Sequence, residues 1–182
     1  MADYDTNYSV VNRILLVEDD EAEREATRIV LREAGFDVEV AKDGGQAHAA
    51  FTMNKPDMIV LDLILPNESG FEVCERFKQQ DSTIPVLIYS AITLEDAHRL
   101  AERVGADDYL EKPADGETLV TRVRDVAEEV WRKLHLESPS DAGDRVRFVC
   151  PHCGVKIKVR GTHRGRQLSC PTCGVRITVP RT

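Results

Sequence analysis

The sequence predicts an α/β fold: a doubly wound parallel sheet of five strands, followed by a much smaller β domain. Three observations support this. Short apolar runs alternate five times with segments of helical periodicity between about residues 13 and 134, the pattern of a parallel sheet covered by helices. Most of the runs are continuously apolar, as expected for strands buried on both faces. After residue 149 a C-x-x-C sequence occurs twice, which indicates a separate unit.

Each predicted element depends on a local pattern. The central strand is the run MIVL over 58–61, which ends in Asp62 and is followed by turn residues. The first helix is expected to end at Gly35, a residue suited to the C′ position, and Thr93 is expected to cap the fourth helix. The predicted strands cover 13–18, 36–41, 58–61, 84–89 and 105–110, and the predicted helices cover 21–34, 44–53, 71–80, 93–104 and 115–134.

Charged and polar side chains fall at the carboxyl ends of these strands. Because connections between parallel strands are right-handed, the expected strand order is 2-1-3-4-5, the flavodoxin-like order. In this order strands 1 and 3 flank the point where the winding reverses, and their ends carry Asp19, Asp20 and Asp62. Strands 4 and 5 bring Ser90 and Lys112 to the same edge. Open α/β sheets place their binding sites at this edge.

This set of side chains suits phosphate chemistry. Clustered carboxylates repel one another, and Mg²⁺ relieves the repulsion by binding one or two carboxylates, water and phosphate oxygens. An amine and a hydroxyl opposite them can hold further phosphate oxygens, and an aspartate can itself accept a phosphoryl group. The sequence therefore predicts Mg²⁺-dependent phosphoryl transfer onto Asp62. Taken singly, Ser90 is an ordinary turn residue, Lys112 a solvated cation, and Asp19 or Asp20 a helix cap.

Residues 12–134 resemble the receiver domain of two-component response regulators. The resemblance rests on four matches: the acidic pair after LLVE, the pattern D-x-x-x-P-x-x-x-G from Asp62 to Gly70, Ser90-Ala91, and GADDYLEKP over 105–113. It implies that a histidine kinase or phosphotransfer protein supplies a phosphoryl group. A phosphorylation-dependent dimer is an open alternative for the response.

The same resemblance implies which residues accept the phosphoryl group, bind Mg²⁺ and signal the change. The site residues are the phosphoacceptor Asp62; the magnesium ligands Asp20, Asp62 and the backbone carbonyl of Ile64, with Asp19 acting through water; and the phosphoryl-binding and switch residues Ser90, Ala91, Tyr109 and Lys112. Tyr109 is expected to turn inward when Ser90 does. The resemblance also implies that the Lys112–Pro113 bond is cis, a rare feature even for bonds to proline.

The residue two positions after Asp62, Ile64, bears on whether the protein is a phosphatase. Phosphatases of the haloacid-dehalogenase type also phosphorylate an aspartate, but they have a D-x-D pattern whose second acid protonates the leaving group. Ile64 occupies that place here, so a phosphatase is disfavoured and the protein is expected not to be an enzyme.

The lifetime of the phosphate is a second expectation. In receivers the residues two beyond the phosphoacceptor and two beyond the strand-4 hydroxyl flank the hydrolytic water. These are Ile64 and Ile92, and neither can orient water, so slow loss of phosphate is expected.

The charge distribution separates the two domains. The chain of 182 residues has a net charge of −8. Nine Lys and Arg residues against Asp141 and Asp144 give +7 from residue 141 onward, so the rest carries −15.

No signal-peptide pattern or membrane-spanning run is present, which predicts a cytoplasmic protein without membrane contact. The expected divisions are an arm over 1–11, the receiver domain over 12–135, a linker over 136–144 and a second domain over 145–182.

The second domain contains two near copies of a metal-binding turn. Cys150-Pro-His-Cys153-Gly and Cys170-Pro-Thr-Cys173-Gly lie twenty residues apart, and each is followed by an alternating strand. Two such turns make a tetrahedral Cys₄ site, the geometry of structural zinc. One Zn²⁺ is therefore predicted in these four cysteines; disulfides are disfavoured by a cytoplasmic location, and a thioredoxin-like pair by the duplication. Cys74 is expected to be a buried apolar residue.

The segment resembles the short prokaryotic zinc ribbon of bacterial proteins, and the resemblance includes Phe148 and Val179-Pro180. It brings little information about function. As the output of the receiver, the ribbon is expected to bind a protein, with nucleic acid as the alternative. Its positive charge favours nucleic acid, whereas the lack of aromatic residues other than Phe148 leaves nothing for base stacking.

Overall fold

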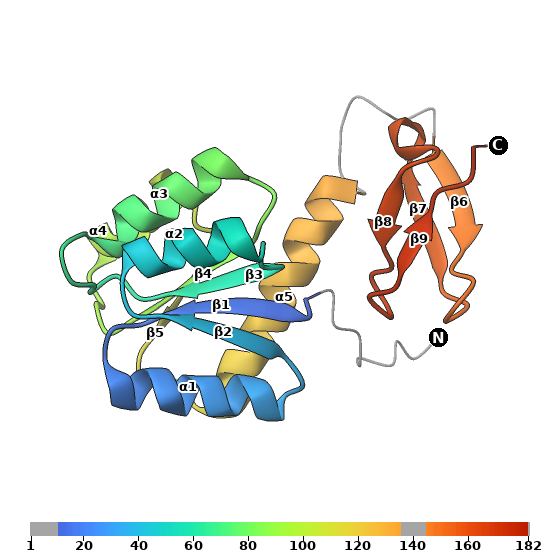
Figure 1. Cartoon of the computed structure of the whole chain (residues 1–182). Helices are drawn as coiled ribbons and strands as arrows, with labels where there is room; N and C mark the ends of the chain where they lie inside the picture. Colours follow the sequence, from blue (N-terminus) through green and yellow to red (C-terminus); the bar gives the residue numbers. More distant parts are fainter. Residues whose placement is uncertain (1–10, 136–144, 182) are drawn as a thin grey trace. The chain divides into compact units, whose positions relative to one another are not determined.

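The computed structural model describes residues 11–135 and 145–181. Two compact units divide after Ala127: an α/β unit, and a second unit that contains the end of the last long helix and a small β domain (Figure 1). The linker predicted over 136–144 lies outside the described residues, as does all of the predicted arm except Val11, which is buried. No helix among the described residues has the length and apolar character needed to cross a membrane.

The α/β unit is built on one parallel sheet. Its strands are β1 (Arg13–Val17), β2 (Asp37–Ala41), β3 (Met58–Leu61), β4 (Val86–Ser90) and β5 (Asp108–Glu111). They lie in the order β2-β1-β3-β4-β5, and every neighbouring pair is parallel. The predicted order is therefore confirmed. Val17 is paired with Leu61, so β1 and β3 end side by side, and the residues that follow them emerge at the same point.

Helices cover both faces of this sheet. They are α1 (Glu21–Glu33), α2 (Gly44–Met53), α3 (Gly70–Gln80), α4 (Glu95–Arg103) and α5 (Gly116–His135). Helices α2, α3 and α4 lie on one face and α1 and α5 on the other (Figure 1). Two contacts tie α1 to α5: Gly116 lies against Val30, and the Arg124 guanidinium donates to the Ala34 carbonyl over 3.4 Å.

The core of the unit consists of the apolar strands and the inner faces of the helices. All four residues of β3 are buried, as predicted for a strand covered on both faces. On the α2–α3 side the rings of Phe51 and Phe77 stack with their centroids 4.9 Å apart. Cys74, also in α3, is fully buried, which confirms the expectation that it acts as an apolar residue.

Helix ends follow local capping chemistry, with one exception to the predictions. Gly35 follows α1 with a φ of +95°, a conformation that glycine adopts without strain. The prediction that Thr93 caps the fourth helix was wrong. Helix α4 begins after Leu94, whose side chain makes no capping hydrogen bond. Leu94 remains exposed, and the backbone N–H groups of Ala97 and His98 are satisfied by its carbonyl.

The small β domain repeats one hairpin-like pattern. Strands β6 (Arg145–Val149) and β7 (Lys156–Arg160) pair antiparallel, as do β8 (Gln167–Ser169) and β9 (Arg176–Thr178), with a short 3₁₀ helix, η1 (Gly161–His163), between the pairs. Each cysteine turn is closed by an equivalent bond, in which Cys150 N donates to Val155 O and Cys170 N to Val175 O. The buried residues of this domain are Val146, Cys150, Ile157, Val159, Cys170, Ile177 and Val179.

Candidate functional site

The carboxyl edge of the sheet gathers an acidic cluster. Carboxylate oxygens of Glu18, Asp19 and Asp62 all lie within 4.8 Å of one another. Glu18 and Asp19 follow the end of β1, and Asp62 follows β3. The cluster arises because these two strands end in register. Glu18 and Asp62 are buried, whereas Asp19 is exposed.

Asp62 is held by its own loop. Its Oδ1 accepts hydrogen bonds from the backbone N–H groups of Leu63, at 2.6 Å, and Ile64, at 3.3 Å. Gly70 keeps this loop close to the strand end, since a Cβ atom there would lie 2.2 Å from the Asp62 carbonyl oxygen. The second carboxylate oxygen, Oδ2, faces Lys112, whose Nζ lies 3.0 Å away. The carboxylate is therefore fixed in orientation by neighbours on both oxygens.

Lys112 connects three carboxylates from different parts of the chain. Its Nζ donates to Asp62 Oδ2, to Glu18 Oε2, and to Glu23 Oε2 at 2.6 Å. Burial by itself would lower the pKa of Lys112, but the three hydrogen bonds raise it above its usual range, so the ammonium stays charged. Burial has the opposite effect on Glu18 and raises the pKa of that carboxyl despite Lys112.

The acids that lie together in the structure differ from the predicted set. Asp19 and Asp62 were predicted site residues and lie together. Asp20, predicted as a direct magnesium ligand, instead caps α1, where its Oδ1 accepts from Ala22 N and Glu23 N at 2.9 Å each. Glu18 takes its place in the cluster. The signal that could have found Glu18 is its position directly after β1, which matches that of Asp62 directly after β3.

The predicted switch residues line the neighbouring edge. Ser90 ends β4, is fully buried, and within the described residues its Oγ has no hydrogen-bond partner. Ala91 beside it is exposed. The hydroxyl of Tyr109 donates to the Ile92 carbonyl over 2.6 Å, and its ring stacks on His98 of α4 with centroids 3.9 Å apart. Burial raises the pKa of Tyr109, so its hydroxyl remains a donor at neutral pH.

These residues suit Mg²⁺ and a phosphoryl group. Carboxylate oxygens of Glu18, Asp19 and Asp62 lie within 4.8 Å of one another and are the hard oxygen ligands that Mg²⁺ prefers. The buried hydroxyl of Ser90 lacks a partner in the described structure, as expected of a donor whose acceptor is a ligand. Lys112 supplies fixed positive charge beside Asp62. The Lys112–Pro113 bond is cis, as the resemblance implied.

A second cluster, in the small β domain, consists of the four predicted cysteines. All four Sγ atoms lie within 4.8 Å of one another; Cys150 and Cys173 are 3.8 Å apart, and Cys153 and Cys170 are 3.6 Å apart. Thiolates bound at about 2.3 Å to one tetrahedral zinc lie about 3.8 Å apart, so the spacing fits this metal. Burial opposes ionisation of Cys150, but backbone N–H groups, including that of His152, lower the pKa of its thiol to about 6.

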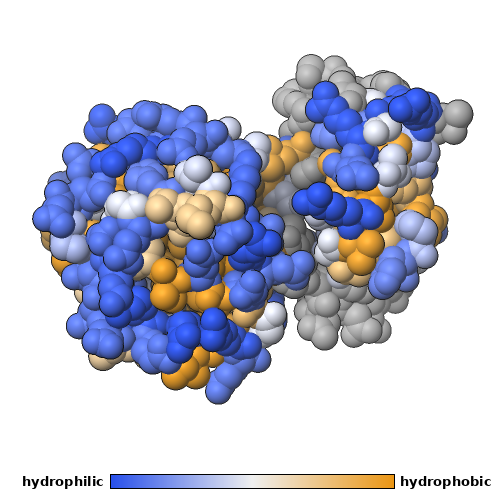
Figure 2. Space-filling model, in the orientation of Figure 1, coloured by the Kyte–Doolittle hydropathy of each residue, from blue (hydrophilic) through white to orange (hydrophobic). Residues whose placement is uncertain are grey.

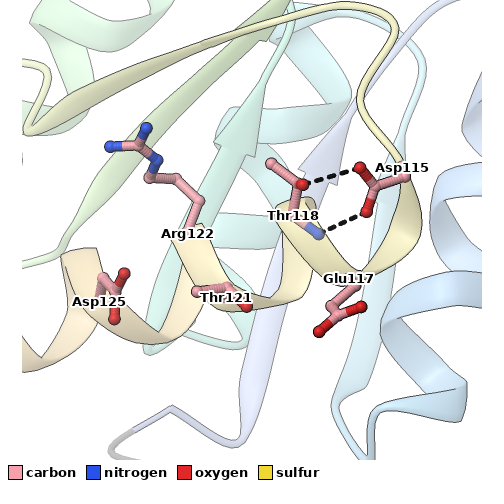
Figure 3. Close-up of a pocket in the computed structure, with 6 residues that line it drawn as sticks. All are labelled: Asp115, Glu117, Thr118, Thr121, Arg122 and Asp125. Atoms are coloured by element: carbon pink, nitrogen blue, oxygen red, sulfur yellow. Dashed lines mark hydrogen bonds between the residues drawn. The ribbon is translucent and has the colours of Figure 1, made fainter.

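A shallow concave surface on α5 has an ordinary explanation. It is lined by Asp115, Glu117, Thr118, Thr121, Arg122 and Asp125 (Figure 3). The Asp115 carboxylate accepts from both the backbone N–H and the hydroxyl of Thr118, each at 2.8 Å, the interactions of a helix cap. Arg122 pairs with Asp108 of β5 at 2.9 Å. Asp115, Thr118 and Arg122 are therefore engaged in local structure.

Comparison with known proteins gives a consistent result for the α/β unit. Residues 14–124 match the response regulator receiver domain family. The chain is 40% identical over 139 residues to the transcriptional regulatory protein TrcR of Mycobacterium tuberculosis, covering 74% of this chain and 51% of that protein. It is 41% identical over 163 residues to the response regulator MprA of a Mycobacterium species (strain KMS), covering 86% of this chain and 66% of that protein. The chain thus spans about half the length of the first of these relatives and less than two thirds of several others.

Solved structures agree. A response regulator from Chloroflexus aurantiacus, described as putative, superposes with a TM-score of 0.62 at 33% identity, covering 65% of this chain and 98% of that one. The BeF3-activated receiver domain of Klebsiella pneumoniae RstA gives a TM-score of 0.61 at 28% identity, covering 64% of this chain and 98% of that one. Both similarities concern a length of chain close to that of the α/β unit.

Proposed function

Since residues 14–124 place this chain in the response regulator receiver domain family, we propose that Asp62 accepts a phosphoryl group from a histidine kinase or a phosphotransfer protein. The bond from phosphorus to the donor nitrogen breaks as a bond from phosphorus to an Asp62 carboxylate oxygen forms. The protein acts as a signalling switch rather than an enzyme, in keeping with relatives that are named transcriptional regulatory proteins. A cytoplasmic location fits this role.

One observation carries the proposal: Asp62 shares the acidic cluster with Glu18 and Asp19, and its Oδ2 lies 3.0 Å from Lys112 Nζ. Glu18 and Asp19 are the acids that, with Asp62, would hold Mg²⁺, and the Ile64 carbonyl is a further candidate ligand. The metal would neutralise charge on the incoming phosphate. Lys112 and Ser90 would then hold two phosphoryl oxygens. Movement of Ser90 towards the phosphate would leave space that Tyr109 fills by releasing the Ile92 carbonyl.

The experiment is labelling with a small phosphodonor and Mg²⁺. We expect one phosphoryl group per chain, located at Asp62 by mass spectrometry, and none after Asp62→Asn. Asp57→Asn is the matched control, because Asp57 is an exposed aspartate that accepts from Asn12 N and Arg13 N. Labelling that survives Asp62→Asn, or that disappears equally in Asp57→Asn, would contradict the assignment.

For the second unit we propose a zinc ribbon that serves as the output of the switch. The four thiols support it by their spacing, and the two antiparallel strand pairs support it by their arrangement around the cysteine turns. Phosphorylation of Asp62 would alter the surface formed by α4, β5 and α5, the last of which leads along the chain to the ribbon. Pairing of two phosphorylated chains is a second response that the same change in this surface would allow.

The surface of the ribbon favours a protein partner with acidic side chains. Val149 and Val175 are 54% and 37% exposed, and the unit shows apolar surface among its hydrophilic residues (Figure 2). Phe148 packs against the buried cluster, so it is not available for stacking on bases. Nucleic acid is the second candidate, because Arg147 is paired directly with Lys158 across β6 and β7, and like charges in that position repel unless an anion binds.

Salt dependence separates these two partners. If the ribbon binds nucleic acid, its affinity for a mixed-sequence duplex should fall steeply between about 50 and 200 mM salt, because each phosphate contact releases condensed counterions. Arg147→Gln should then reduce the slope. A protein partner predicts no duplex binding at 50 mM salt, together with loss of the partner when Val149 is changed to Ser.

A further inference from the structure

Glu23 makes a contact that neither the fold nor the proposed phosphotransfer requires. It lies in the first turn of α1, and its Oε2 accepts a hydrogen bond from Lys112 Nζ at 2.6 Å. The two residues are 89 positions apart in the sequence. The side chain of Glu23 is 53% exposed, whereas that of Lys112 is only 8% exposed. An accessible carboxylate therefore reaches in from the surface to a buried ammonium.

Helix capping does not explain this contact. Glu23 is three residues after Asp20, the spacing at which a glutamate reaches back to the backbone N–H of the capping residue. In α3 this happens, because Ser69 N donates to Glu72 Oε2 at 3.1 Å. In α1 the equivalent N–H, that of Asp20, donates to Glu18 Oε1 at 3.2 Å instead. The carboxylate of Glu23 is thus directed to Lys112 rather than to its own helix.

The contact leaves Lys112 without a free hydrogen. An ammonium group has three N–H donors, and they go to Asp62, Glu18 and Glu23. A phosphoryl oxygen can be bound by Lys112 only if one of these carboxylates leaves. Glu18 is 2% exposed and also accepts from Asp20 N, so releasing it would strand a buried charge. Asp62 is still an intact carboxylate that holds Lys112 while the phosphoryl group approaches, before the bond to phosphorus forms. Glu23 is the carboxylate that water can rehydrate on release.

We propose that Glu23 is an exchangeable partner of Lys112, which occupies the third ammonium hydrogen before phosphorylation and must give it up to a phosphoryl oxygen. Glu23 is thereby a positioning residue that restrains phosphotransfer onto Asp62. This inference rests on the proposed function, because it takes Asp62 as the phosphoacceptor. It also makes Glu23 a repulsive charge for the anionic donor while the exchange takes place.

The test compares three variants of the full chain, with acetyl phosphate and Mg²⁺ as the phosphodonor. Glu23→Gln removes the charge and weakens the contact, since an amide oxygen holds an ammonium less strongly than a carboxylate. Glu23→Asp keeps the charge but is one carbon too short for the contact. Glu21→Gln removes a charge from the same exposed helix turn without affecting Lys112, whose three hydrogens are donated elsewhere.

We expect Glu23→Gln and Glu23→Asp both to be labelled about two- to fivefold faster than wild type at saturating donor, the range for loss of one charge pair whose acidic member is exposed to water. Glu21→Gln should match wild type. Equal rates in all four proteins would overturn the proposal. The proposal would also be overturned if the labelling rate depended only on net charge, so that Glu21→Gln and Glu23→Gln were equally fast and Glu23→Asp matched wild type. Unfolding midpoints of the variants separate a change in rate from a loss of fold.

The same experiment distinguishes failure of this inference from failure of the proposed function. If Asp62→Asn abolishes labelling but the Glu23 variants react at the wild-type rate, Asp62 is the acceptor and Glu23 does not restrain it. If labelling is absent from every variant or is insensitive to Asp62→Asn, the proposed phosphoacceptor is wrong and the role of Glu23 falls with it.

Discussion

Replacing one zinc ligand should unfold the small β domain while leaving the α/β unit intact. The perturbation is Cys150→Ser, which removes one of four clustered thiols. The Sγ atoms of Cys150 and Cys173 lie 3.8 Å apart, and those of Cys153 and Cys170 lie 3.6 Å apart. These are the spacings expected around a tetrahedral zinc. Cys74→Ala is the matched control, because Cys74 is buried in the other unit and belongs to no cluster of ligands in the described residues.

The magnitude follows from how little else stabilises the domain. Its buried cluster contains five aliphatic side chains, Val146, Ile157, Val159, Ile177 and Val179. At roughly 1.5–3 kcal/mol each they contribute on the order of 8–15 kcal/mol before any entropic cost. Structural zinc contributes an apparent 10–16 kcal/mol or so in peptides of this kind. Since whole domains are stable by only about 5–15 kcal/mol, loss of the metal should exceed the net stability.

The assay combines zinc analysis with backbone amide NMR of the full chain. Wild type and Cys74→Ala should carry one zinc per chain and show dispersed signals from both units. Cys150→Ser, or wild type with a strong chelator, should lose the dispersed signals of residues 145–181 only. The reasoning is refuted if wild type reconstituted with zinc binds none, or if the Cys150→Ser domain keeps its dispersed signals in the presence of the chelator.

Three further outcomes are expected. If Asp62 phosphate is long-lived because no polar side chain orients water beside it, Ile64→Asn with Ile92→Ser should speed its hydrolysis at least severalfold; wild-type loss within seconds, with no acceleration in the variant, would contradict this. Gly70→Ala should destabilise the unit by about 1–3 kcal/mol or more in urea denaturation, because its Cβ would meet the Asp62 carbonyl oxygen at 2.2 Å; an unchanged midpoint would show that the loop moves freely. Because burial raises the pKa of Cys74 to about 12, its thiol stays protonated at pH 8 and should be alkylated only after unfolding, as followed by mass spectrometry.

Local pattern was sufficient to predict the sheet. The apolar runs around Leu15, Ile59 and Leu87 predict strands buried on both faces, and the right-handed crossover leaves only a few orders for them. The predicted order 2-1-3-4-5 is the one observed. The position of Asp62 followed from the same pattern, because a charged residue at the end of a buried strand emerges at the edge. The start of α4 was missed, since the exposed Leu94 offers no capping signal.

The sequence by itself determined the strand order, through the alternation of strands and helices and the handedness of their connections, and it placed Asp62 at the end of a buried strand and two cysteine turns twenty residues apart. Tertiary structure alone decided which acids meet. Three consecutive acids follow β1, and only the register of β1 with β3 places Glu18 and Asp19 beside Asp62 and leaves Asp20 to cap α1. The hydrogen bond from Lys112 to Glu23 likewise joins residues 89 positions apart, and the sequence around either one does not predict the other. It forms because the end of β5 and the start of α1 lie at the same edge of the sheet.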